Sequence, residues 1–231
     1  MIRFLYRLAT TAYFILIHLA AWFKPKAKLW VEGRKHWRQH LPKPTPGEAW
    51  VWVHCASLGE FEQGRPVIEA LKAQYPHVRI LLTFFSPSGY EVRKDYPLAD
   101  AVRYLPADTP ANARDFVQAL PLRLVIFVKY EHWLFYLEAL KATPVLLVSA
   151  YLRPEQFRGL KAAYFRNVLR YYAHIFVQDA AGAKLLRSIL PQERITVAGD
   201  TRFDRVVAIA RERKPLPLLE AFIAGRFCVM A

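Results

Sequence analysis

Glu60 is the acidic residue whose setting most suggests chemistry. It follows an apolar run at 51–53 and a turn of small residues at 56–59, and it begins a helical pattern. A carboxylate at such a turn could act as a general base at the mouth of a cleft, where Gly59 would leave room for a substrate. The alternative is a capping box, in which the side chains of Ser57 and Glu60 bind each other's backbone N–H groups. The local sequence leaves both interpretations open.

The elements around Glu60 alternate between apolar runs and amphipathic segments. Strands are predicted at 50–54, 78–84, 101–105, 123–128, 144–149, 174–177, 194–198 and 226–230. Helices are predicted near 60–75, 88–96, 110–119, 132–142, 155–171, 180–190 and 203–213. This β-α repetition indicates an α/β fold with a doubly wound parallel sheet.

Polar residues follow most of these predicted strands. Because the carboxyl ends of parallel strands meet at one edge of the sheet, where ligands bind, these residues should line one cleft. They are Glu60, Ser86, Ser88, Glu131, Arg153, Gln178, Asp179, Asp200 and Arg202. Ser86 and Ser88 could bind an acceptor phosphate at a helix N-terminus, although a plain helix cap explains them equally well. His54 lies inside an apolar strand, which favours a hydrogen-bonded core histidine over a ligand.

The N-terminus combines an apolar stretch with an excess of cations. Residues 8–23 contain no charged side chain, and residues 1–43 contribute a net charge of +8 to the total of +14. This pattern predicts a membrane anchor at 1–24, spanning or interfacial, next to anionic lipid. A signal peptide is the rival interpretation, but a poor cleavage context follows Ala20 and Ala21.

Composition excludes several other classes. The sequence has two cysteines, too few for a disulfide framework, and its histidines and cysteines show no metal-site spacing, so no metal is expected. A nucleic-acid partner is not expected either, because no basic stripe with interleaved aromatics occurs.

Seven motifs occur in order along the chain: HCASLGE at 54–60, TFFSPSGYE at 83–91, YLPADTP at 104–110, FVKYEHW at 127–133, LVSAYLR at 147–153, FVQD at 176–179 and GDTRFDRV at 199–206. Together they resemble the 3-deoxy-D-manno-octulosonic acid (Kdo) transferase family. The resemblance implies a Rossmann-like N-terminal domain of a GT-B type glycosyltransferase, on the cytoplasmic face of the bacterial inner membrane. It also implies transfer of Kdo from CMP-Kdo, a co-substrate rather than a cofactor, to a lipid A precursor.

The resemblance also implies roles for single residues. Glu60 matches the general base, Glu131 matches a carboxylate that stabilises the transition state, and Arg202 falls where many members have another cation. Ser57, Gly59, Ser86, Ser88 and Arg153 are predicted to bind substrate. Without the family, Glu131 could be an acid at a helix start, and Arg202 could be a surface cation or a partner of Asp200 or Asp204.

The predicted domain organisation follows from the same comparison. Residues 1–24 form the anchor, 25–47 a basic juxtamembrane segment and linker, and 48–213 the acceptor-binding domain. Residues 214–231 resemble a linker and the first strand of a second domain that binds CMP-Kdo, so the chain is expected to be a fragment of the enzyme. The alternatives are a membrane-bound module that binds glycolipid without catalysis, and a nucleotide-sugar transferase with another acceptor.

Overall fold

One parallel sheet organises the part of the chain that the structure describes. The computed structural model contains all 231 residues and describes residues 1–212, apart from the side chain of Leu160. In these residues the sheet has seven strands in the order β3-β2-β1-β4-β5-β6-β7, and all neighbours are parallel. The predicted segment 214–231, with its strand at 226–230, lies outside the described residues.

The strands match the apolar runs in the sequence to within one residue at each end. They are β1 Trp50–Cys55, β2 Arg79–Phe84, β3 Ala101–Tyr104, β4 Leu122–Val128, β5 Val145–Ala150, β6 His174–Val177 and β7 Ile195–Val197. β1 lies between β2 and β4 and is buried at every position, as expected for a parallel strand covered on both faces. The predicted doubly wound parallel sheet is therefore confirmed.

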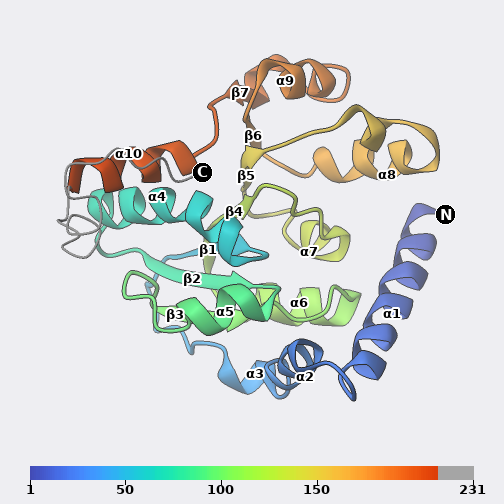
Figure 1. The fold of residues 1–231 in the computed structure, drawn as a ribbon, viewed down its shortest axis with the longest axis vertical. Helices are drawn as coiled ribbons and strands as arrows, with labels where there is room; N and C mark the ends of the chain where they lie inside the picture. Colours follow the sequence, from blue (N-terminus) through green and yellow to red (C-terminus); the bar gives the residue numbers. More distant parts are fainter. Residues whose placement is uncertain (213–231) are drawn as a thin grey trace, which may run out of the picture.

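Helices connect the strands and cover both faces of the sheet (Figure 1). They are α1 Ile2–Ala20, α2 Pro25–Glu32, α3 Trp37–His40, α4 Leu58–Gln74, α5 Pro87–Arg93, α6 Pro110–Gln118, α7 Leu134–Ala139, α8 Gly159–Leu169, α9 Ala180–Leu186 and α10 Arg202–Glu212. The helix predicted at 155–171 is in fact broken into a 3₁₀ turn, Pro154–Phe157, and α8. The break lies at Gly159, whose φ of 59° falls in the left-handed region that favours glycine.

The core has a layer on each side of the sheet. On one side, Val51 and Val53 pack with Phe61 of α4. On the other side, Trp52 packs with Phe116 of α6 and with α7. Because side chains alternate along a strand, His54 shares the side of Trp52. The strand thus directs a histidine toward the loop that precedes α7.

The basic segment after α1 packs on the domain through a buried arginine. Arg34 is 9 % exposed and donates to the backbone oxygens of Trp30, Phe85 and Leu105. Its guanidinium also lies over the Trp30 ring, 3.8 Å from the ring centroid. Arg34 was counted among the cations facing a membrane, and that interpretation is wrong for this residue. It instead joins α2 to the loops that follow β2 and β3.

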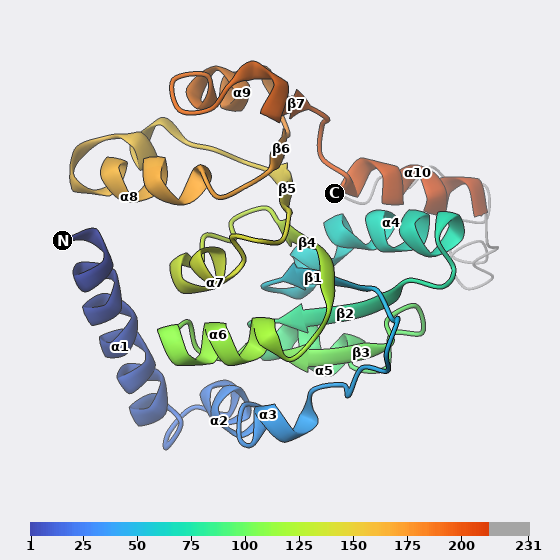
Figure 2. The same cartoon turned by 180° about the vertical axis from the view of Figure 1, so that it is seen from behind.

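Helix α1 lies beside the same loops (Figures 1 and 2). The Tyr6 hydroxyl donates to Asp108 Oδ2 at 2.5 Å, next to the start of α6, and Phe14 stacks on Trp30 with 5.6 Å between centroids. Large apolar side chains elsewhere on this helix are exposed: Phe4, Leu5, Leu8, Ile15, Leu16 and Leu19. One face of α1 therefore packs on the domain while the other presents apolar surface to its surroundings.

Candidate active site

The strand order places a crevice between β1 and β4. The chain moves outward from β1 to β2 and β3, and then returns to the other side of β1 at β4. In doubly wound sheets ligands bind at this reversal, outside the carboxyl ends of the strands. Glu60 follows β1 and Glu131 follows β4. The two predicted catalytic carboxylates therefore flank the reversal.

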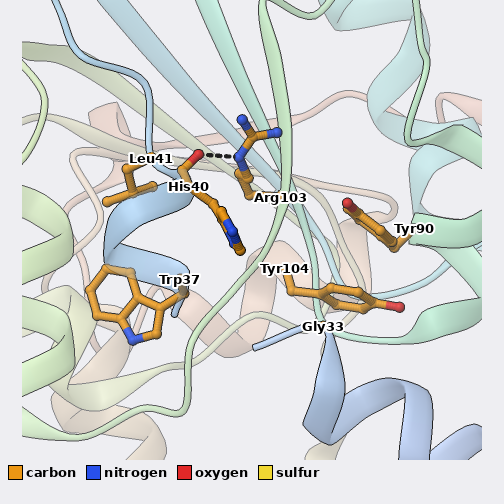
Figure 3. Close-up of a pocket in the computed structure, with 7 residues that line it drawn as sticks. All are labelled: Gly33, Trp37, His40, Leu41, Tyr90, Arg103 and Tyr104. Atoms are coloured by element: carbon orange, nitrogen blue, oxygen red, sulfur yellow. Dashed lines mark hydrogen bonds between the residues drawn. The ribbon is translucent and has the colours of Figure 1, made fainter. Parts of the chain in front are cut away.

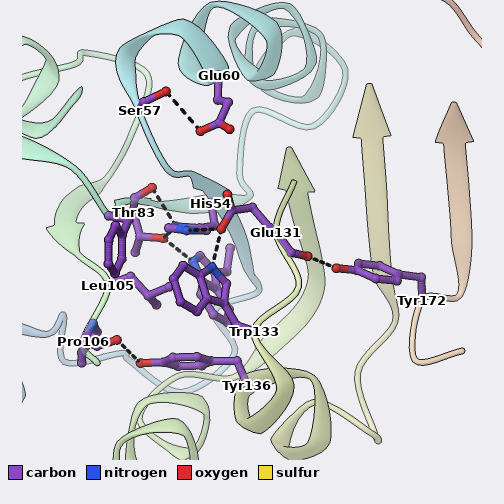
Figure 4. Close-up of polar contacts among 12 residues, drawn as sticks. His54, Ser57, Glu60, Thr83, Leu105, Pro106, Glu131, Trp133, Tyr136 and Tyr172 are labelled. Atoms are coloured by element: carbon purple, nitrogen blue, oxygen red, sulfur yellow. Dashed lines mark hydrogen bonds and ion pairs between the residues drawn. The ribbon is translucent and has the colours of Figure 1, made fainter. Parts of the chain in front are cut away.

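Glu131 lies in the loop between β4 and α7, where it is 3 % exposed. Its Oε2 atom accepts a hydrogen bond from Trp133 Nε1 and lies 2.9 Å from His54 Nε2, an ion-pair distance (Figure 4). The Tyr172 hydroxyl donates to the backbone oxygen of Glu131. Because α7 begins only at Leu134, Glu131 is not an acid in a first helical turn. It is a buried carboxylate held by specific neighbours.

Glu60 lies in the first turn of α4 and is partly buried. The Ser57 hydroxyl donates to Glu60 Oε2 at 3.2 Å. Within the described residues, the Ser57 side chain accepts no hydrogen bond from the backbone N–H groups at the start of α4. The reciprocal capping box is therefore not formed. Burial and the negative charge of Glu131 raise the pKa of Glu60 to about 7, against lowering effects of His54 and of hydrogen bonds from Ser57. Figure 4 shows the Glu60 carboxylate pointing toward His54 and Glu131.

Arg202 lies at the start of α10 and pairs with Asp200. Its Nε and Nη2 atoms lie 2.9 and 2.6 Å from Asp200 Oδ2, so the alternative that makes Arg202 a partner of Asp200 describes this structure. Gln63, three residues after Glu60, donates to Asp200 Oδ1 at 2.8 Å, and Thr201 donates to the Gln63 backbone oxygen at 2.6 Å. These bonds tie the loop of Arg202 to the helix of Glu60.

The remaining predicted residues lie on different parts of this edge. Ser86 caps α5 by accepting from the Ser88 backbone N–H at 3.3 Å, so the cap interpretation describes this pair. Arg153 lines a separate cavity of about 800 Å³ with Tyr130 and His132. Burial lowers the pKa of His132 to about 4. This cavity is therefore lined by the neutral imidazole of His132 and by the guanidinium of Arg153. His132 directly follows Glu131 in the sequence.

Gly59 is exposed at the turn before Glu60. A methyl group added there would meet no heavy atom of the described residues within 4 Å. A second pocket, of about 330 Å³, lies against the edge strand β3 and is lined by Trp37, Arg103 and Tyr104 among others (Figure 3). It is two strands away from β1, so it is not the crevice that contains the carboxylates.

The sequence interpretation missed several polar residues of this site. The prediction that His54 is a hydrogen-bonded core histidine is confirmed by its burial and its contact with Thr83, but its contact with Glu131 was not predicted. Gln63, Ser149 and Thr201 were not singled out. Ser149 lies at the end of β5 with a left-handed φ of 50°, and its hydroxyl lies 2.8 Å from that of Thr201. Strained non-glycine residues are enriched at functional sites. The helical spacing of Gln63 from Glu60 was the one signal available in the sequence.

The fold and the paired carboxylates define the class first. The structure is a Rossmann-like α/β domain with a seven-stranded parallel sheet and an apolar N-terminal helix. It is similar in fold to the UDP-GlcNAc 2-epimerase of Neisseria meningitidis, with a TM-score of 0.58 and 15% identity, covering 77% of this chain and 53% of that one. The epimerase of Methanocaldococcus jannaschii has a TM-score of 0.56 and 14% identity, over 79% and 54% of the two chains.

Sequence comparison gives the family. The family model for 3-deoxy-D-manno-octulosonic-acid transferase (kdotransferase) matches residues 33–205, and the chain belongs to this family. It is 28% identical over 161 residues to the transferase of Haemophilus influenzae, covering 67% of this chain and 38% of the relative. It is 36% identical over 104 residues to the transferase of Aquifex aeolicus, covering 45% and 28%. The match therefore spans well under half the length of these relatives.

Proposed function

We propose that this chain is the acceptor-binding half of an enzyme that transfers Kdo from CMP-Kdo to a lipid A precursor. The observation that supports this most is the carboxylate pair at the sheet reversal, in a chain that belongs to the Kdo transferase family. A general base works best when its pKa is close to the operating pH. The pKa of Glu60, raised to about 7, meets that requirement.

The proposed reaction is a single displacement. A hydroxyl oxygen of the acceptor bonds to the anomeric carbon of Kdo, the bond from that carbon to the phosphate oxygen of CMP breaks, and Glu60 takes the hydroxyl proton. Glu131 stabilises positive charge that develops on the sugar. Arg202 is 55 % exposed at its side chain, so the N–H groups not used by Asp200 can bind the acid group of the donor. Ser57, Gly59, Ser86, Ser88 and Arg153 are proposed to contact substrate.

The membrane would be contacted through α1. It is the helix, among the described residues, that is long and apolar enough to cross a bilayer. Arg3 lies 3.2 Å from Glu138, Tyr6 binds Asp108, and Phe14 packs on Trp30, so α1 contacts the domain along most of its length. A helix held in this way suits an interfacial position better than a spanning one. We place it on the cytoplasmic face of the bacterial inner membrane, against anionic lipid.

The proposed domain organisation keeps 48–213 as the acceptor-binding domain and assigns donor binding to a part of the enzyme after it. The match to 28% and 38% of the relatives' lengths supports this division. The second candidate function is a membrane-bound module that binds glycolipid and catalyses nothing.

The test is transfer from freshly generated CMP-Kdo to a lipid A precursor in detergent. The 231-residue chain is compared with a version extended through the downstream reading frame, each with and without Glu60→Gln. The extended protein should transfer Kdo, and Glu60→Gln should lower the rate by about 10²-fold or more while thermal unfolding stays unchanged.

The matched control is Glu62→Gln. Glu62 lies on the same helix but pairs with Arg93 at 2.9 Å, and its replacement should leave transfer intact. Full activity of the Glu60→Gln protein would remove Glu60 from the mechanism. Lipid binding without transfer by either length of chain would favour the module that only binds.

A further inference from the structure

His54 is a fully buried polar residue with a contact at each ring nitrogen. It is 0 % exposed, although it lies in the central strand of the sheet. Its Nδ1 atom lies 2.8 Å from the Thr83 hydroxyl and 3.1 Å from the Thr83 backbone oxygen, in the partner position on β2. Its Nε2 atom lies 2.9 Å from Glu131 Oε2. The imidazole thus joins β2 to the loop after β4.

The contacts at the two ring nitrogens differ in kind. Within the described residues Nε2 makes no hydrogen bond, so its 2.9 Å to Glu131 Oε2 is a close contact at ion-pair distance. The Thr83 hydroxyl can donate to Nδ1 or accept from it, and it already accepts from Trp52 Nε1 at 2.7 Å. The ring therefore contacts Thr83 through Nδ1 and lies against Glu131 through Nε2.

Two ring nitrogens lie close to a single oxygen of Glu131. Trp133 Nε1 donates to Oε2, and His54 Nε2 approaches the same atom from β1. A buried carboxyl would otherwise favour its protonated form, because burial penalises charge. The ring of His54 is itself held by Thr83 and by edge-on packing against Phe127, with 5.8 Å between centroids. The histidine is thus fixed in place beside Glu131.

We propose that His54 is a positioning residue of the transfer reaction, which holds Glu131 as an oriented carboxylate beneath Glu60. The proposal rests on the function proposed for Glu131. His54 itself does not touch substrate; it acts through the carboxylate. Several titratable or polar groups face Glu131 from the elements around it: His54, Cys55, Glu60, His132, Tyr164 and Tyr172.

Two amide variants separate the two contacts of the ring. In His54→Gln the amide nitrogen can occupy the position of Nε2 and donate to Glu131. In His54→Asn the amide can occupy the position of Nδ1, which keeps the Thr83 contact and loses Glu131. Both variants place a neutral amide at the same buried position, so they differ mainly in which contact of the ring is kept. His174→Gln is the control, because His174 is a strand histidine that pairs with Thr196, at 2.9 Å.

The first measurement is transfer by the extended protein described above. His54→Asn should lower kcat by at least about tenfold relative to His54→Gln, with KM for the acceptor little changed, because the lost interaction acts in the transition state. His174→Gln should match the unmodified protein. If His54 only supports the core through Thr83, His54→Asn should be the more active variant, which would overturn the proposal.

The second measurement is independent of activity. Carbon-13 NMR of glutamate-labelled 231-residue chain, with Glu131→Gln to assign the signal, follows protonation of Glu131. His54→Asn should increase the protonated fraction of Glu131 near neutral pH, and His54→Gln should not. If His54→Asn does not fold, the His54→Gln protein decides: a protonated Glu131 in it would overturn the proposal.

The two proposals fail in different ways. Equal transfer and equal Glu131 ionisation in both amide variants would exclude His54 while leaving the transferase proposal in place. A Glu131 signal that responds as expected, in an extended protein that is folded but transfers no Kdo, would leave the His54–Glu131 contact established and exclude the transferase proposal.

Discussion

The turn after β1 and the loop after β4 each bring one carboxylate to the same edge of the sheet, in opposite surroundings. Glu131, after β4, is 3 % exposed and has Trp133 and His54 at one oxygen. Glu60, after β1, is partly exposed and receives the hydroxyl of Ser57. Burial and the nearby Glu131 raise the pKa of Glu60 to about 7.

The difference separates two kinds of catalytic work. A base must gain a proton during the reaction, which suits a partly solvated carboxyl whose pKa is near neutral. A group that stabilises charge must keep its own charge and position, which suits a carboxylate fixed by N–H donors. Paired acidic groups with diverging environments are typical of acid–base sites.

Replacing Glu131 and replacing Glu60 should change the free energy of unfolding by very different amounts, and this is the largest effect that we expect. Glu131→Ala leaves the Trp133 N–H group buried without its acceptor and removes the carboxylate against His54, and should lower the free energy of unfolding by about 3–5 kcal/mol. The folded-state pKa of Glu60 lies above the ordinary value of 4.5, so its ionisation destabilises the fold as pH rises toward 7. At pH 8, Glu60→Ala should therefore leave that free energy unchanged or higher. Urea unfolding measures both, and equal losses would contradict the comparison.

Two glycines in α4 provide the next contrast. A methyl group on Gly64 would lie 2.9 Å from Cys55 Sγ and 3.2 Å from Val128 Cγ2, so Gly64→Ala should cost about 1–3 kcal/mol. Gly59→Ala should leave stability unchanged or raise it by up to about 1 kcal/mol, because helix propensity improves in open space. Its transfer activity should nevertheless fall if substrate approaches there. Normal activity of the Gly59→Ala protein would remove that role.

The pH dependence of transfer tests the coupling between the two regions. In the unmodified enzyme the rate should rise as Glu60 loses its proton, with a midpoint near its pKa of about 7. Glu131→Gln removes a negative charge that raises this pKa, so the midpoint should move to lower pH by about one unit. Rates of kcat/KM from pH 5 to 9 show the shift. A midpoint that stays in place would mean that the carboxylates do not interact.

Replacing Arg202 should have the smallest effect on stability. The pair with Asp200 is exposed on the arginine side, and Asp200 keeps its bond to Gln63, so Arg202→Ala should cost about 1 kcal/mol or less. The pKa of Asp200 is raised by burial but brought to about 2 by its hydrogen bonds with Arg202 and Gln63, and it should rise in the variant. Loss of transfer by about 10²-fold in this stable protein, rescued by Arg202→Lys, would support a role in catalysis.

Much of the fold was predictable because buried parallel strands are continuous apolar runs. The apolar runs at 51–53 and 123–128 identify two buried strands without any alternation of polar and apolar residues, and turn residues mark their ends. The convergence of Glu60 and Glu131 on one edge followed from the parallel connection alone.

The rest depended on packing that local sequence does not encode. Arg34 resembles any cation of a basic segment, and its burial depends on backbone oxygens of Phe85 and Leu105, more than 50 residues away. His54 is the core histidine that its apolar strand predicts, but its contact with Glu131 depends on how the loop after β4 packs. The sequence offered Asp200 and Asp204 as partners of Arg202, and the geometry of the turn brings Asp200 to the guanidinium.

The contacts of α1 have a mechanical consequence. Asp108, which accepts from Tyr6, also accepts from the backbone N–H groups of Phe135 and Tyr136 at the start of α7. Because α1 is fixed to the loops of the crevice, the domain cannot rotate freely relative to this helix. If α1 rests on a membrane, as proposed above, the crevice is held at a fixed height and tilt over that surface. A substrate embedded in the membrane would then meet the crevice in one orientation.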